Sequence, residues 1–179
     1  THGIVNLAWR QLYYGVKKVR HHGVTTYFID NEWYFKRDQL YGYQDDAERF
    51  AYFCRAVLAM LPEIGFHPDI IHCHDWHTGL VGTFLKEDFK SDRFYKGIKV
   101  IYTNPQLSVS GQLSAVSPAR CPRPAAESLF HGQCSYEGRV NYMKAGIVYA
   151  DAVTTVHSEY DGCEAELAAE PGPGLDRYL

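Results

Sequence analysis

The chain lacks the features that mark membrane proteins and nucleic-acid-binding proteins. No apolar run reaches about 18 residues, the length that a membrane-spanning helix needs, and no signal peptide opens the sequence. Neither sign of charge prevails, because 18 Lys and Arg face 21 Asp and Glu, for a formal net charge of −3. A protein that binds by neutralising phosphates would be basic. We therefore expect a protein that binds neither nucleic acid nor a membrane.

Cysteine is sparse and irregularly spaced. The cysteines are odd in number and form no C-x-x-C motif, which argues against a disulfide framework; they are Cys54, Cys73, Cys121, Cys134 and Cys163. Reduced thiols are typical of the cytosol, so we expect a cytoplasmic protein. The sequence also lacks an initial Met, and the start at Thr1 leads us to interpret the chain as a fragment of a longer protein.

One stretch of the sequence, residues 69–79, changes character abruptly. Its first half is a short apolar run after Pro68, which favours a buried strand. Large, polar or titratable residues follow this run, namely His74, Asp75, Trp76 and His77. A helical pattern then begins at Thr78. Ligands of open α/β sheets bind at the carboxyl ends of strands, where a helix N-terminus adds N–H groups. We therefore place the candidate site here.

Strands and helices alternate along most of the chain. The expected elements are a hairpin at 13–29, a polar and aromatic loop at 30–46, helices at 46–61, 78–89, 138–149 and 158–169, and strands at 69–73, 98–103 and 152–156. Strand–helix–strand units of this length predict an α/β fold, with a parallel sheet flanked by helices. Asp45 or Asp46 should cap the first long helix.

Residues 104–135 break this alternation. Four prolines fall here and no hydrophobic periodicity survives, so we expect an irregular segment; the prolines are Pro105, Pro118, Pro122 and Pro124. The chain as a whole is long enough for one domain with a hydrophobic core, because it has 179 residues and 46% of them are hydrophobic.

Several long motifs, in order, resemble bacterial glycogen synthase. They occupy residues 27–32, 34–38, 41–43, 45–50, 68–79, 140–146 and 149–156, and the resemblance covers about residues 4–103 and 138–156. That family, with plant starch synthases, transfers glucose from ADP-glucose to the non-reducing end of an α-1,4-glucan. The anomeric configuration is retained, and the family needs no metal or other cofactor.

The resemblance implies that the parallel sheet flanked by helices is Rossmann-like, and that it forms a partial N-terminal domain of a two-domain GT-B glycosyltransferase. Residues 1–179 would then be part of this catalytic domain, without the C-terminal nucleotide-binding domain and without the family's Lys-Thr-Gly-Gly-Leu loop. Asp75 matches an active-site aspartate and is the expected catalytic residue. Tyr41 matches an active-site tyrosine, and His74 and His77 lie inside a family motif, so all three are expected to bind substrate. These motifs leave the oligomeric state open.

The sequence departs from the family after the strand at 98–103. The family continues Thr-Ile-His-Asn-Leu-Ala-Tyr-Gln-Gly, with a catalytic His, whereas Pro105 stands at that position here. Codons can be chosen for residues 104–111 that, read one base later, encode the family motif. We therefore hypothesise a one-base insertion after the Thr103 codon, which would make 104–135 aberrant and the fragment inactive alone.

Two alternatives remain. The chain could be a non-catalytic remnant, at most a weak glucan-binding module. Less favoured is a metal-dependent hydrolase with His72, His74 and His77 as ligands, because the order of His and Asp does not fit the hydrolase motif H-x-H-x-D-H. Asp75 is expected to cap the helix that follows it and to bind substrate as well, since one carboxylate can do both.

Overall fold

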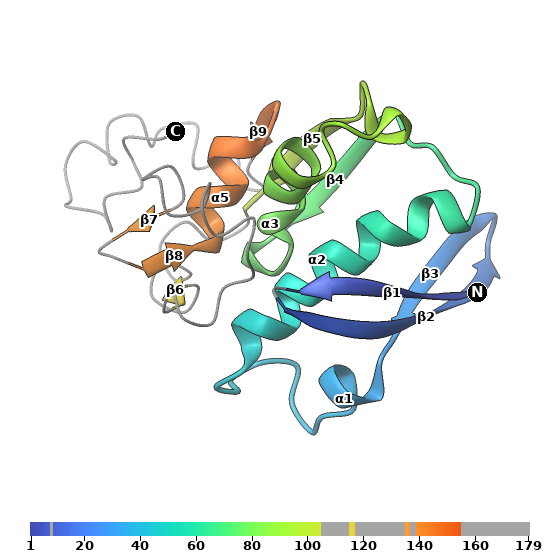
Figure 1. The fold of residues 1–179 in the computed structure, drawn as a ribbon, viewed down its shortest axis with the longest axis horizontal. Helices are drawn as coiled ribbons and strands as arrows, with labels where there is room; N and C mark the ends of the chain where they lie inside the picture. The colour runs from blue at the N-terminus through green and yellow to red at the C-terminus, as the bar shows by residue number, and fades with distance from the viewer. Residues whose placement is uncertain (8, 105–114, 117–134, 137–138, 155–179) are drawn as a thin grey trace.

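The computed structural model describes residues 1–7, 9–104, 115–116, 135–136 and 139–154 (Figure 1). Its centre is a parallel sheet with the strand order β4-β5-β9, made of β4 (Ile70–His74), β5 (Lys99–Thr103) and β9 (Ala152–Thr154). The predicted α/β class and its three parallel strands are therefore confirmed. In register, His74 lies opposite Thr103, and Thr103 lies opposite Thr154. The carboxyl ends of the three strands thus form one row.

Helices cover one face of this sheet. They are α2 (Asp46–Glu63), α5 (Tyr142–Tyr149) and a run of turns made of η1 (Trp76–Thr78), α3 (Leu80–Thr83) and η2 (Phe84–Asp88). The run replaces the single helix predicted at 78–89, and it winds unevenly, as a 3₁₀ turn, an α turn and a π turn. A further 3₁₀ turn, η3 (Arg93–Tyr95), precedes β5. None of the described helices is long and apolar enough to cross a membrane.

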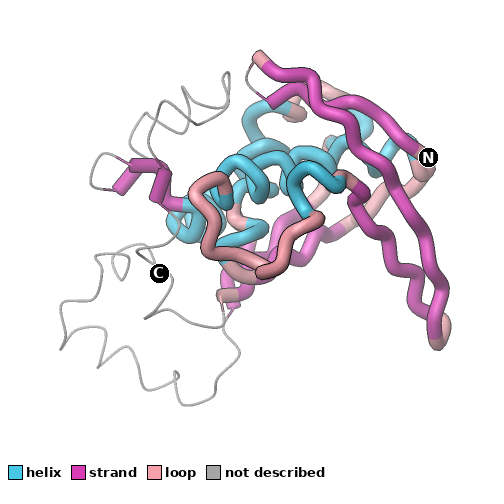
Figure 2. The backbone as a smooth tube through the Cα atoms, turned by 90° about the horizontal axis from the view of Figure 1, so that it is seen from below, coloured by secondary structure: helices cyan, strands magenta, loops and turns pink. Residues whose placement is uncertain are grey.

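A second, antiparallel sheet packs against α2. It has the order β1-β2-β3, with β1 (His2–Leu7), β2 (Arg10–His21) and β3 (Val24–Asp30). The predicted hairpin is confirmed, with His22 and Gly23 at its turn, and its far end extends beyond the helices (Figure 2). The sequence did not predict β1, in which Val5 and Leu7 are buried while Ile4 is exposed.

The core surrounds α2, which contacts β1 and β3 on one side and η1 and α3 on the other. Its small and aromatic buried residues include Ala51, Tyr52, Cys54 and Ala56. Because α2 lies between two layers, both of its flanks exclude water, and burial of apolar surface there is the main stabilising contribution. The Tyr52 hydroxyl donates to the Tyr13 carbonyl at 2.7 Å, which ties α2 to β2.

Three local predictions need correction. The stretch 30–46 was expected to be a loop, but it contains one helical turn, α1 (Glu32–Phe35), which Asn31 caps; a single turn is too short to show periodicity. Asp45 precedes α2 without a capping bond, because its carboxylate pairs with Arg37 at 2.7 Å. The helix predicted from residue 138 begins at Tyr142, since Asn141 caps it through Lys144 N–H.

A small third sheet has the order β6-β8-β7, with β6 (Ala115–Val116), β7 (Ser135–Tyr136) and β8 (Arg139–Asn141). Residues 115–116 and 135 are therefore strand within the segment expected to be irregular. The rest of that segment after Asn104, the predicted helix at 158–169 and the end of the strand at 152–156 lie outside the described residues.

Two glycines, Gly79 between η1 and α3 and Gly82 within α3, let this segment approach α5 closely. A Cβ added at Gly79 would lie 2.0 Å from the Tyr142 carbonyl oxygen, and one at Gly82 would lie 3.1 Å from the Tyr149 carbonyl oxygen. Both distances end on backbone atoms, which cannot move aside as a flexible side chain would. Gly79 therefore sets how closely these two helical segments pack.

We predict that Gly79→Ala lowers the free energy of unfolding by about 3 kcal/mol, the upper range for overpacking a core. Its backbone is α-helical, so helix propensity alone would favour Ala by about 1 kcal/mol. Gly82→Ala is the graded comparison and should cost less, because the contact that it creates is longer. Urea unfolding of both variants measures the difference, and a Gly79→Ala chain as stable as the wild type would contradict this packing.

Candidate active site

The Asp75 turn joins β4 to η1 in a strained conformation. Its φ is 63° and its ψ is 170°, and among the described residues His22 is the only other non-glycine with positive φ. Such a conformation costs on the order of 1–3 kcal/mol and persists only when surrounding contacts hold it. Here the Asp75 N–H donates to the Thr103 carbonyl at 2.9 Å, and the Thr78 N–H donates to the Asp75 carbonyl at 3.1 Å.

The Asp75 carboxylate does two things at once. Oδ1 accepts from the Trp76 N–H at 2.7 Å, so the predicted cap is confirmed. Oδ2 lies 3.7 Å from Nδ1 of His77, and the side chain is 38% exposed. Oδ1 is therefore used in capping the turn, whereas Oδ2 lies beside His77 on a partly exposed side chain.

His77 sits among aromatic rings. Its ring stacks on Trp76 at 4.0 Å between centroids and meets the edge of Phe50 at 4.5 Å. Tyr41, from the loop between α1 and α2, places its half-exposed ring 5.6 Å from that of His77. The structure thus brings Asp75, His77 and Tyr41 together, although Tyr41 is distant from the other two in sequence.

The surroundings of His77 favour its neutral form. Burial is the main cause that lowers its pKa below 6.5, and Arg49 adds to it, whereas Asp75 and Asp46 oppose the shift. A neutral imidazole has one nitrogen that donates and one that accepts. His77 can therefore exchange both kinds of hydrogen bond with a polyhydroxylated ligand at neutral pH.

His74 belongs to a second group at the same edge of the sheet. Its ring lies 4.1 Å from that of His72. Nε2 of His72 lies 2.7 Å from Oγ1 of Thr103, which lies 2.6 Å from Oγ1 of Thr154. Sequence reasoning missed both threonines, although Thr103 is the last residue of the strand expected at 98–103 and was a usable signal.

The described residues offer no metal centre of the predicted alternative kind. No group of three or more His, Cys, Asp or Glu in that part of the chain could hold an ion. His77 contacts Trp76 and Phe50, whereas His72 and His74 contact each other. The positions of these three histidines therefore do not support the hypothesis of a metal-dependent hydrolase.

Pro105, the predicted replacement of the family's catalytic His, lies outside the described residues, so the frameshift hypothesis stays a prediction. Asn104, the last residue before it, is buried. Its N–H donates to the Thr154 carbonyl at 3.2 Å, and its amide nitrogen lies 2.9 Å from Sδ of Met143. The chain is therefore anchored at the carboxyl end of β5 up to this residue.

Known proteins match the whole chain. The family model of the starch synthase catalytic domain matches residues 2–179. A glycogen synthase from Desulforamulus reducens is 44% identical over 100% of this chain and 37% of its own length. One from Geobacillus stearothermophilus is 46% identical over 98% of this chain and 36% of its own length. The solved catalytic domain of starch synthase IV from Arabidopsis thaliana, bound to ADP and acarbose, has a TM-score of 0.85 at 28% identity, over 100% of this chain and 37% of that one.

The fold and these matches define a glycosyltransferase-type α/β domain of the GT-B class. The chain belongs to the starch synthase catalytic domain family, as its resemblance to bacterial glycogen synthase predicted. It spans about 37% of the length of the relative from Desulforamulus reducens. Its assignment to the N-terminal part of a two-domain enzyme, and the domain bounds 1–179, stay predictions.

We predict that Asp75→Gly is more stable than Asp75→Ala by about 1 kcal/mol. Both variants lose the cap on Trp76, but only Gly adopts positive φ without strain. Part of that gain is offset by the greater freedom of Gly in the unfolded chain. Denaturant unfolding of the two variants isolates the strain, and an Ala variant as stable as the Gly variant would show that the turn is relaxed.

We also predict a pH dependence from His77. Because its folded pKa lies below the unfolded value of 6.5, the unfolded state binds more protons in the window below 6.5, and stability falls as the pH drops through it. NMR titration should place the midpoint of His77 below 6.5. The stability of His77→Gln should fall less than that of the wild type across the same window; a midpoint above 6.5 would contradict this prediction.

Proposed function

We propose that this chain forms part of the active site of a glucan synthase. The enzyme transfers glucose from ADP-glucose to the non-reducing end of an α-1,4-glucan, with retention of the anomeric configuration. The observation that carries the proposal is the Asp75 carboxylate, held on a strained turn at the carboxyl end of β4 beside His77 and Tyr41. Family membership supports the reaction class, and the ADP and acarbose bound to the Arabidopsis starch synthase support the ligand chemistry.

Asp75 is the catalytic residue in this proposal. Its exposed oxygen accepts hydrogen bonds from glucose hydroxyls, and its negative charge stabilises an oxocarbenium-like transition state. Tyr41 offers a ring face to the sugar, and the neutral His77 exchanges hydrogen bonds with hydroxyl groups. His74 binds substrate from the neighbouring group at the same sheet edge. No metal or other cofactor takes part.

The second candidate is a non-catalytic, weak glucan-binding module. Pro105 in place of the family's His favours it. Retention of the 179-residue chain on immobilised glucan tests this second candidate. We expect no glucosyl transfer by this chain alone under either candidate, so transfer by the 179-residue chain would exclude the non-catalytic module, and the first candidate needs a test in a longer protein. We also propose a cytoplasmic location, which the free thiols of Cys54 and Cys73 support.

The proposed activity is tested in a chimera. Residues 1–103 replace the matching stretch of the Geobacillus stearothermophilus glycogen synthase, followed by Ile-His-Asn-Leu-Ala-Tyr-Gln-Gly in place of residues 104–111. This restored chimera should transfer labelled glucose from ADP-glucose to glycogen. Asp75→Asn should lower the rate at least ~100-fold, the scale for removing one transition-state contact. The same chimera with residues 104–111 of this chain should lose activity to a similar extent.

Cys73→Ala is the control in this chimera. Cys73 is buried on β4, the strand that precedes Asp75, so its truncation should lower the thermal stability and leave the transfer rate largely unchanged. A normal rate for Asp75→Asn would remove Asp75 from the mechanism. A normal rate for the version with Pro105 would show that the family's His is dispensable.

A further inference from the structure

The loop that carries Tyr41 is held from the first turn of α2. Nη2 of Arg49 donates to the Leu40 carbonyl at 3.2 Å, and Oδ2 of Asp46 accepts from the Gly42 N–H. These bonds fall on the residues immediately before and after Tyr41. The backbone of Tyr41 is thus fixed on both sides by two side chains that are three positions apart on one helix.

The two side chains also bind each other in a nearly dry environment. Nη1 of Arg49 lies 2.6 Å from Oδ1 of Asp46, and the side chain of Arg49 is only 3% exposed. Its guanidinium lies over the rings of Phe35, Tyr43 and Phe50, at 5.7, 5.4 and 5.0 Å from their centroids. Removing one partner of such a buried pair leaves the other charge uncompensated. The arrangement therefore has little freedom to relax.

The same helical turn also places the Phe50 ring next to His77. Phe50 follows Arg49 directly, and its ring meets that of His77 at 4.5 Å. The Tyr41 ring approaches His77 at 5.6 Å. Residues 46–50 of α2 thus place two of the rings around His77, one directly and one through the loop.

We propose that Asp46 and Arg49 are positioning residues that hold Tyr41 against His77 before substrate binds. This inference rests on the proposed function, in which Tyr41 offers a ring face to the sugar, and it takes that sugar to belong to the glucan. Gly42, next to Tyr41, has a φ of 104°, and a Cβ added there would meet nothing within 4 Å, so local packing at Gly42 does not fix the loop. Holding it in advance avoids an ordering cost at the moment of binding.

The test compares Arg49 with Arg55 of the same helix. Arg55 pairs with Asp88, and its guanidinium lies over Phe84 and Phe89 at 5.2 and 5.7 Å from their centroids. It is therefore matched to Arg49 in charge and aromatic surroundings, but its partners lie in η2 or directly after it, and not in the loop that carries Tyr41. Arg49→Lys and Arg55→Lys should both lower the thermal stability of the 179-residue chain.

The deciding readout is the NMR cross-peak between the ring protons of Tyr41 and His77. Arg49→Lys should abolish this cross-peak, because the single ammonium group of Lys cannot reproduce the planar guanidinium, which binds the Asp46 carboxylate and the Leu40 carbonyl through two different nitrogens. Asp46→Asn, which keeps an acceptor for the Gly42 N–H but loses the ion pair, should weaken it. Arg55→Lys should retain it. A cross-peak that survives in both Arg49→Lys and Asp46→Asn, or that Arg55→Lys also abolishes, would overturn the proposal.

The restored chimera supplies the functional readout. Tyr41→Ala and Arg49→Lys should each raise KM for glucan about 10-fold with a smaller change in kcat, and the double variant should resemble the single ones, because both act through one ring. Additive effects would overturn the proposal. If Tyr41→Ala leaves KM unchanged while Arg49→Lys still removes the cross-peak, the role of Tyr41 in the proposed function fails and the link between Arg49 and Tyr41 stands.

Discussion

The positive φ of Asp75 is the constraint on which the rest of the site depends. It turns the chain sharply as it leaves β4, so that Trp76 enters the core and His77 reaches Phe50. An ordinary extended residue would carry the chain onward past the sheet edge. The strain is balanced by the bond from the Asp75 N–H to the Thr103 carbonyl and by the cap on Trp76. The conformation that orients the carboxylate is therefore fixed by the sheet itself.

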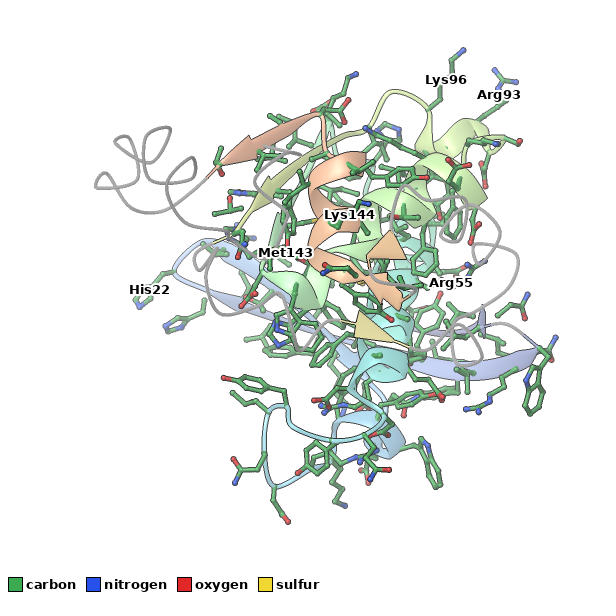
Figure 3. The ribbon with its side chains drawn as sticks, turned by 90° about the vertical axis from the view of Figure 1, so that its left-hand side faces the viewer. His22, Arg55, Arg93, Lys96, Met143 and Lys144 are labelled. Carbon is green, nitrogen blue, oxygen red and sulfur yellow. The ribbon has the colours of Figure 1, made fainter. Side chains whose placement is uncertain are left out.

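The helices behind the sheet keep this turn in place. The Tyr142 hydroxyl at the start of α5 donates to the Ala47 carbonyl of α2 at 2.7 Å, while Gly79 lets the segment after the turn lie against the Tyr142 backbone. Figure 3 shows Met143 and Lys144 on α5 within the body of the molecule, whereas His22 projects from the tip of the hairpin. The site thus lies where α2, α5 and the η1 turn meet, far from the freely exposed end of the antiparallel sheet.

Sequence patterns predict the parts of this structure that local rules determine. Apolar runs located β4 and β5, the His21–Gly23 turn located the hairpin, and the position of Asp75 after a strand predicted both its cap and its place at the sheet edge. The contacts of Arg49 could not be predicted in this way. Its spacing from Asp46 is visible in the sequence, but its bond to the Leu40 carbonyl depends on how a nonperiodic loop folds back. The sequence analysis placed His74 just after the strand expected at 69–73, whereas the structure makes it the last residue of β4. Its contact with His72 follows from strand alternation, because residues two apart on a strand lie on the same face.

The charges around His77 indicate which half of the proposed reaction this chain serves. Burial lowers the pKa of His77, Asp75 and Asp46 oppose this shift, and Arg49 adds to it; the Arg49 guanidinium is already bound to Asp46. The cluster therefore presents carboxylate oxygens, a neutral imidazole and ring faces, which suit the hydroxyl groups and apolar faces of a sugar. A diphosphate would meet the uncompensated carboxylate of Asp75 and be repelled. Under the proposed function, this cluster holds glucose and glucan, and the positive charge that stabilises the departing diphosphate comes from another part of the enzyme.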